Sequence, residues 1–168
     1  MKKYLKMSKN KSNNVFISHF WKDDDKVQKL KQRLSDKGYS IKNYSVDSTK
    51  HTRKKTPSDA VIKRFLRMQV NWSGTFICLI GPRTHTRKWV NYEIEQAHKL
   101  GKKIVGVYTH GNNEKVELPS NFKKYGGATI GWNSLDKLGD IMNGKEIPIE
   151  NQSGNARQPL YQYEPVSC

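Results

Sequence analysis

The strongest constraint on the fold is the run Thr75–Ile80, which is apolar on both of its faces. A strand of this kind is typical of a sheet that is covered on both sides. Other short apolar runs alternate along the chain with segments of about 14 residues that have helical periodicity. This alternation requires crossover connections, which pair strands in parallel. We therefore predict a flavodoxin-like, doubly wound α/β fold with a central parallel sheet of about five strands.

Apolar spacing, capping residues and glycine stops place the individual elements. Strands are expected at residues 14–18, 39–46, 75–80, 103–108 and 128–132. Helices are expected at residues 23–38, 56–72, 87–100 and 134–142. The second helix is predicted to begin with Thr56 as its cap and Pro57 as its first residue. One side of that helix carries four apolar side chains, those of Val61, Phe65, Met68 and Trp72.

Three segments follow from this pattern. We expect residues 1–13 to form a flexible basic leader and residues 14–144 to form an α/β domain. Residues 145–168 are expected to form an extended tail, which could pack on the domain through Leu160, Tyr161 and Tyr163. The longest apolar run is far shorter than the ~20 residues that span a bilayer. The two cysteines cannot form a disulfide framework. We expect a soluble, cytoplasmic protein without membrane contact.

The net charge of +16 favours polyanionic ligands or reflects solubility alone. Basic residues concentrate in the leader and in the loop 48–56. A nucleic-acid binder would be expected to carry basic strands with interleaved aromatic residues or a groove-reading motif, and the sequence has neither. Nucleic acid is therefore the least favoured of the partners considered.

Ligands of open α/β sheets bind beyond the carboxyl ends of the strands. Here those ends carry Ser18, His19, Phe20 and Trp21 after the first strand, Asp47 after the second, and Arg83 after the third. The sequence contains neither GxGxxG after the first strand nor GxxxxGK[ST], which disfavours a Rossmann dinucleotide site and a P-loop. No cysteine, histidine and carboxylate cluster has metal-ligand spacing, so no metal and no bound cofactor are expected.

Glu93 is the most unusual carboxylate of the chain. On a helical wheel it lies within the apolar sector formed by Trp89, Val90, Ile94 and Ala97, whereas Glu95 lies on the opposite side. An ionised carboxylate against an apolar wall loses solvation and needs a donor, a raised pKa or an opening pocket. Such burial indicates either a functional carboxylate or a structural one paired with Lys or Arg.

The run from Val15 to Asp23, VFISHFWKD, resembles the first strand and loop of TIR domains, which typically read V-F-I-S-Y-S-x-x-D. The segments from Gly38, from Phe76 and from Gly101 are similar to their second, third and fourth strands. Trp89-Val90-Asn91-Tyr92-Glu93 resembles their W-C-x-x-E motif, with Val90 in place of cysteine. The resemblance covers residues 14–133 and is closest to the TIR-like group of the Thoeris anti-phage ThsB proteins. His19 stands where tyrosine is common.

Catalytic TIR domains cleave the nicotinamide–ribose bond of NAD, so the resemblance implies NAD as a substrate and Glu93 as the catalytic residue. The product would be ADP-ribose or a cyclic or conjugated derivative that switches on a separate effector in anti-phage defence. The residues expected to bind the substrate are Ser18, His19, Phe20, Trp21, Asp47, Arg83 and Trp89. The resemblance equally allows self-assembly through TIR surfaces. It also leaves open a non-catalytic adaptor that acts by protein–protein interaction.

Overall fold

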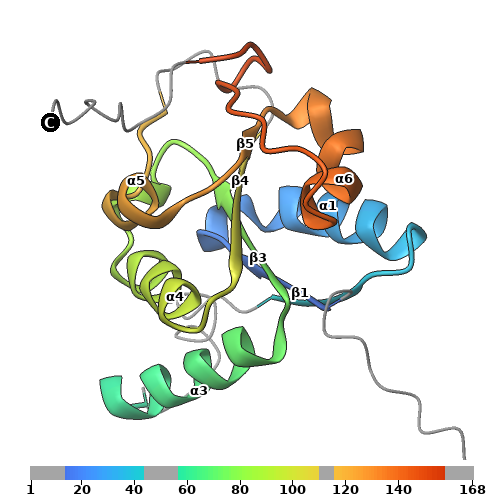
Figure 1. Ribbon diagram of the computed structural model, residues 1–168. Helices are drawn as coiled ribbons and strands as arrows, with labels where there is room; N and C mark the ends of the chain where they lie inside the picture. Colours follow the sequence, from blue (N-terminus) through green and yellow to red (C-terminus); the bar gives the residue numbers. More distant parts are fainter. Residues whose placement is uncertain (1–13, 44–56, 110–115, 158–168) are drawn as a thin grey trace, which may run out of the picture.

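The computed structural model describes residues 14–43, 57–109 and 116–157 (Figure 1). Five strands form one sheet in the order β2-β1-β3-β4-β5, and all neighbouring pairs are parallel. They are β1 (Asn14–Ser18), β2 (Ser40–Asn43), β3 (Thr75–Ile80), β4 (Lys103–Tyr108) and β5 (Thr129–Ile130). This strand order confirms the predicted flavodoxin-like α/β fold.

Five α-helices are described: α1 (Asp24–Asp36), α3 (Asp59–Trp72), α4 (Lys88–Lys99), α5 (Ser120–Tyr125) and α6 (Leu138–Met142). Short 3₁₀ turns precede three of them: η2 (Trp21–Asp23), η3 (Thr84–Thr86) and η4 (Trp132–Lys137). The predicted stops at Gly38 and Gly101 are confirmed, since both have positive φ angles, of 84° and 65°. The six-residue helix α5 was not predicted, because one and a half turns are too short to show a periodic pattern.

The helices form two layers, one on each side of the sheet (Figure 1). Alternate side chains of the strands point to opposite faces, so each strand contributes to two cores. Val15 and Ile17 of β1 pack with α1, η4 and α6, on what we call the α1 face. Phe16 of β1 and Cys78 of β3 pack with α3, α4 and α5, on the α4 face.

Helix α3 differs from its prediction in its start and in its buried side. Ser58, not Thr56, caps the helix, because its Oγ accepts a hydrogen bond from the backbone N–H of Val61 at 3.4 Å. Pro57 therefore lies just before the cap. The buried residues are Ile62, Leu66 and Val70.

The side of α3 that the sequence marked as apolar faces outward. Val61 is 58% exposed and Met68 is 61% exposed. Phe65 is also exposed, and Trp72 is half-buried with the Lys42 ammonium 4.4 Å from its ring centroid. Helix α3 therefore carries two apolar stripes. The sheet and α4 cover the stripe of Ile62, Leu66 and Val70, whose residues are spaced by four.

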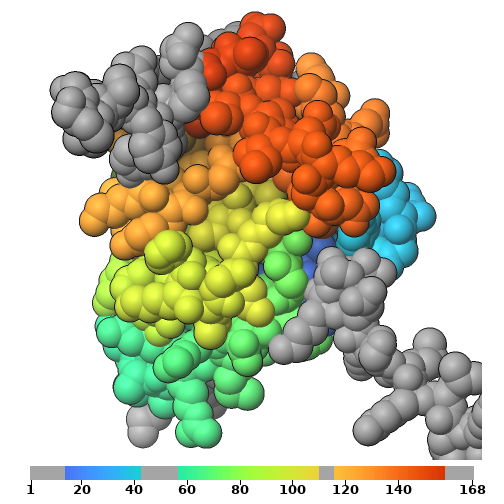
Figure 2. Space-filling view, in the orientation of Figure 1, coloured from blue at the N-terminus to red at the C-terminus, as the bar shows by residue number. Residues whose placement is uncertain are grey.

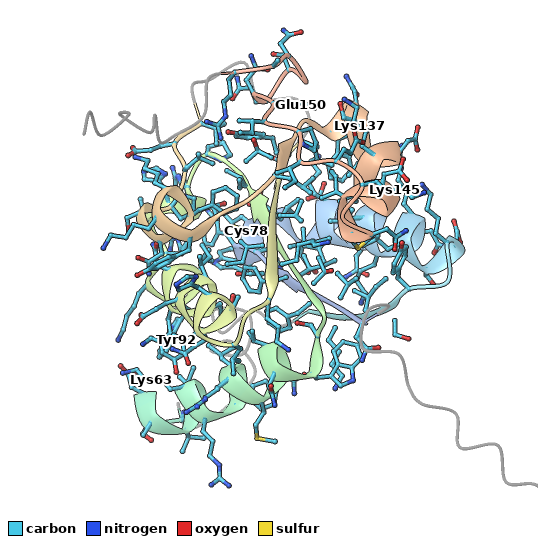
Figure 3. The ribbon with its side chains drawn as sticks, viewed as in Figure 1. Lys63, Cys78, Tyr92, Lys137, Lys145 and Glu150 are labelled. Atoms are coloured by element: carbon cyan, nitrogen blue, oxygen red, sulfur yellow. The ribbon has the colours of Figure 1, made fainter. Side chains whose placement is uncertain are left out.

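The described part of the C-terminal segment, residues 145–157, is attached to the edge of the sheet. Ile149 forms a parallel bridge with Thr129, and Glu150 an antiparallel bridge with Ala156. Glu150 is buried and accepts hydrogen bonds from the Gly131 backbone N–H and the Lys137 ammonium (Figure 3). These bonds hold the segment against the end of β5.

The remaining sequence predictions concern residues outside the described ranges. These are the leader 1–13, the loop 48–56 with Asp47, residues 44–46 of the second predicted strand, and residues 158–168 of the tail. Among the described helices, none is long and apolar enough to cross a membrane.

Candidate active site at the carboxyl ends of β1 and β3

Glu93 meets the end of β1 through a hydrogen bond with Ser18. Glu93 lies on α4 and is only 3% exposed. Ser18 is the last residue of β1, and its Oγ donates a hydrogen bond to Glu93 Oε2. The two residues are 75 positions apart in the chain. A donor at this place offsets part of the solvation that the carboxylate loses on burial.

The surroundings of Glu93 are apolar. Ser18 pairs in register with Cys78 of β3, which is fully buried on the α4 face (Figure 3). Burial raises the pKa of the Cys78 thiol, and the nearby Glu93 carboxylate raises it further. The thiol is therefore neutral and inert near pH 7. Val90, Ile94 and Ala97 complete the buried row of α4.

A contact with the distant helix α5 and a closed turn after β3 fix the position of α4. The Asn91 Oδ1 accepts a hydrogen bond from the Asn121 backbone N–H at 3.0 Å, and the Asn121 side chain donates to the Asn91 carbonyl at 2.8 Å. At the end of β3, the Gly81 N–H donates to Thr84 Oγ1 at 2.8 Å, which closes the turn before α4. The first half of α4, which carries Glu93, is therefore held in place by α5 and by the turn after β3.

His19 and Phe20 continue from Ser18 and are both buried. His19 Nε2 lies 3.5 Å from Asp24 Oδ1. Burial lowers the pKa of His19, and the negative charge of Asp24 partly opposes this shift. The Arg87 guanidinium lies over the Phe20 ring, 3.9 Å from its centroid. This arrangement brings a cation to the rim of the site.

Trp21 is 37% exposed and meets the Phe20 ring edge-on at 5.7 Å. The Lys22 ammonium lies 5.5 Å from the centroid of the Trp21 ring. Sequence reasoning placed the rim cation at Arg83, whose side chain is exposed. Arg87 was not singled out, since nothing in the local sequence distinguishes it from Arg83. Both residues precede α4, and only the packing of Phe20 selects one of them.

Trp89 lies one helical turn before Glu93 on α4, where the helix contacts α3. Trp89 packs against Ile62 and Leu66 of α3 and meets Tyr92 edge-on at 6.0 Å. Figure 3 shows Tyr92 and Lys63 facing each other between α4 and α3, with the Lys63 ammonium 5.8 Å from the Tyr92 ring centroid. Asp47 lies outside the described residues. Within the described ranges, no three His, Cys, Asp or Glu side chains are grouped as metal ligands.

Asp23 is a second carboxylate at this rim and ends the run VFISHFWKD that resembles the first strand and loop of TIR domains. It belongs to η2, and a Cβ added to Gly81 would lie 2.6 Å from its Oδ2. A side chain at position 81 would therefore displace the Asp23 carboxylate. Asp23 Oδ2 is buried without a hydrogen-bond partner among the described residues. Burial raises the pKa of Asp23 to about 6, the Asp25 charge adds to the shift, and Lys26 opposes it.

Asp23→Asn is expected to stabilise the protein at neutral pH but not near pH 4. The folded protein holds the proton of Asp23 up to about pH 6, whereas the unfolded chain releases it near 3.8. The free energy of unfolding therefore falls as pH rises between these values. We expect the variant to gain about 1–2 kcal/mol over the wild type at pH 7. Urea denaturation at pH 4 and pH 7 measures this difference, and a gain that is equal at both values contradicts the raised pKa.

A family model matches residues 16–114, which is more than half of the chain and includes the end of β1, all of α4 and the Ser18–Glu93 contact. The family is described as Thoeris protein ThsB, TIR-like domain. The chain belongs to this ThsB TIR-like family. The resemblance that the sequence motifs indicated is thereby confirmed, and Glu93 lies inside the matched TIR-like region.

A curated relative bears the same family name. A curated relative of this TIR-like domain is ThsB1 of Bacillus cereus (strain MSX-D12), whose name marks it as a proposed cyclic ADP-D-ribose synthase. It is 30% identical over 102 residues, which are 60% of this chain and 49% of that protein. The chain thus spans about half the length of this relative.

Two solved structures are similar to this chain at low sequence identity. A 2-deoxyribosyltransferase from Bacillus psychrosaccharolyticus has a TM-score of 0.56 and 16% identity, covering 74% of this chain and 91% of that one. The TIR domain of the Toll-related receptor TRR-2 from Hydra magnipapillata has a TM-score of 0.49 and 14% identity, covering 77% and 92%.

Proposed function

We propose that the chain cleaves the nicotinamide–ribose bond of NAD and forms a cyclic or conjugated ADP-ribose derivative as a signal in anti-phage defence. The observation that carries this proposal is the buried Glu93 carboxylate, held by Ser18 at the carboxyl end of β1. Membership of the ThsB TIR-like family and the name of its relative ThsB1 support the choice of NAD.

In this mechanism, Glu93 stabilises positive charge on the ribose. The bond between ribose C1′ and the nicotinamide nitrogen breaks, and nicotinamide leaves with the electron pair as a neutral molecule. The resulting oxocarbenium-like carbon is next to the Glu93 carboxylate, which also accepts hydrogen bonds from the ribose hydroxyls. An acceptor then forms the new bond at C1′. Water gives ADP-ribose and a proton, whereas a nucleophile within the same molecule gives a cyclic product.

The aromatic and cationic groups at the rim fit the rest of the substrate. The exposed indole of Trp21 offers a surface on which a base can stack. The Arg87 guanidinium, fixed over Phe20, offers donors to the pyrophosphate. NAD acts here as the substrate and not as a resident cofactor, and the product nucleotide is expected to reach a separate effector.

Mass spectrometry of small molecules tests this proposal directly. The wild-type protein is incubated with NAD, alone and with lysate of phage-infected cells, since TIR enzymes can require a trigger. We expect nicotinamide and a product with the mass of ADP-ribose or of its cyclic form, which is lighter by one water. Absence of nicotinamide release under both conditions contradicts the proposal.

Ser18→Ala is expected to reduce turnover of NAD about tenfold at pH 7. The variant removes the donor to Glu93 Oε2 and so disfavours the ionised carboxylate. The kcat of both proteins measures this effect, and Ser18→Thr, which keeps a hydroxyl donor, should recover part of the loss. A kcat of Ser18→Ala equal to that of the wild type would contradict a role of Ser18 in holding the carboxylate.

The second candidate is a non-catalytic adaptor that binds other proteins. The exposed apolar side chains of Val61 and Met68 on α3 favour it, because such patches often mark interaction surfaces. The adaptor function predicts that NAD is not consumed and that NAD leaves the melting temperature unchanged. The same incubation with NAD therefore separates the two functions.

A further inference from the structure

A groove on the α1 face combines cations with an aromatic wall, on the side of the sheet opposite to Glu93. It runs between α1 and η4, the turn that follows β5. Figure 2 shows the light blue surface of α1 next to the orange-red surface of the C-terminal part of the domain. Its first section encloses about 330 Å³ and is lined by Lys26, Lys29, Arg33, Trp132 and Asn133. A space of this size is in the range of small-molecule sites.

The three cations of the groove lie on one side of α1. Lys26, Lys29 and Arg33 are spaced by three and four residues, which aligns their side chains along the helix. Lys26 forms an ion pair with Asp25 at 3.1 Å. Among the described residues, no carboxylate lies within ion-pair distance of Lys29 or Arg33. Within the described ranges, Lys29 and Arg33 therefore face the groove without a direct ion pair, and the Asp25 carboxylate interacts with Lys29 at longer range.

The opposite wall adds groups that recognise a ring. Trp132 packs partly against the hydrophobic core and lines the groove with the rest of its indole. Asn133 is exposed beside it and can both donate and accept hydrogen bonds. Beyond Arg33 the groove continues for about 300 Å³ over the apolar floor of Leu34, Leu135 and Leu138. Lys37 and the carboxylates of Asp36 and Asp136 line this second section, so the phosphate is assigned to the first section, which no carboxylate lines.

We propose that this groove binds a nucleotide phosphate, with the phosphate on Lys29 and Arg33 and the base on Trp132. The Arg33 guanidinium fits a phosphate as a fork of two donors, and Lys29 adds a point charge. An indole face accepts any base by stacking, and an amide can pair with the polar edge of a base. An inorganic anion would use only the cations, and an acidic peptide has no flat ring to place on Trp132.

The chemistry is the same for a free nucleotide and for a nucleotide within a single strand. Calorimetric titration of the full chain with AMP, inorganic phosphate and a ten-residue single-stranded oligonucleotide distinguishes the two sources. We expect AMP to bind at least fivefold more tightly than phosphate. The affinities for AMP and for the oligonucleotide are compared per nucleotide. Tighter binding of AMP indicates a free nucleotide as the ligand, and tighter binding of the oligonucleotide indicates a single strand. Equal affinity for AMP and phosphate overturns the proposal, because the base then contributes nothing.

Charge reversal in the groove provides the second arm. The double variant Lys29→Glu/Arg33→Glu is expected to bind the nucleotide probe at least tenfold more weakly. The matched control is Arg64→Glu/Arg67→Glu, which makes the same change of net charge on exposed residues of α3, across the sheet. The control should bind within twofold of the wild type. Equal losses in both double variants overturn the proposal, since they indicate only the general positive charge of the chain.

Tryptophan fluorescence locates the base. The nucleotide should quench wild-type emission and the emission of Trp21→Phe, but this quenching should be lost in Trp132→Phe. Quenching that instead disappears in Trp21→Phe places the nucleotide at the Glu93 rim and overturns the proposal. Both readouts are independent of NAD turnover, so failure of the proposed function and failure of this inference are separate results.

Discussion

Replacing Glu93 with glutamine is expected to lower the release of nicotinamide from NAD by about 10²–10³-fold, the usual cost of losing one group that stabilises charge in a transition state. The amide cannot stabilise a positive ribose as a carboxylate does. Glutamine keeps the shape of the side chain, and its Oε1 can still accept the hydrogen bond of Ser18. Nicotinamide release is measured by mass spectrometry, and the melting temperature should not fall.

Glu95→Gln is the matched control for this prediction. It makes the same chemical change two residues away on α4, at a side chain that is partly exposed and paired with Lys99. We expect wild-type turnover in this variant, since Glu95 does not point into the site. Unchanged turnover in Glu93→Gln would exclude Glu93 from the mechanism. Equal losses of turnover in both variants would show that removing any negative charge from α4 lowers the activity, and Glu93 would then have no specific role.

Phe122→Ala is expected to destabilise the fold by about 3–5 kcal/mol, because it empties a closed space in the core of the α4 face. Phe122 is fully buried on α5, and its ring fills the volume that a side chain at Gly106 of β4 would occupy. It thereby joins α5 to the sheet, and α5 in turn holds α4 through Asn91 and Asn121. Urea denaturation of both proteins measures the loss.

Two further variants make the result of Phe122→Ala specific. Phe122→Leu retains most of the volume and should cost clearly less than Phe122→Ala. Met68→Ala removes an exposed side chain of α3 and should change the free energy of unfolding by less than about 0.5 kcal/mol. A loss below 2 kcal/mol in Phe122→Ala would contradict a tightly packed interface between α5 and β4.

The strands and most helices could be predicted because their signals are local. The run Thr75–Ile80 is buried at every position, and Gly38 and Gly101 end the helices before them, as expected. The position of Glu93 in the buried row of α4 also followed from helical periodicity. Helix α5 could not be predicted, since its only core side chain is Phe122 and its length shows no repeat.

Periodicity and capping act within a few residues, so the order of strands and helices, the parallel sheet and the apolar setting of Glu93 were already determined by the sequence. Tertiary structure alone decided which apolar stripe of α3 is buried, that Ser18 bonds to Glu93, that Arg87 covers Phe20, and that α1 and η4 form a basic groove. These contacts depend on how elements distant in the chain pack together, and no local pattern contains that information.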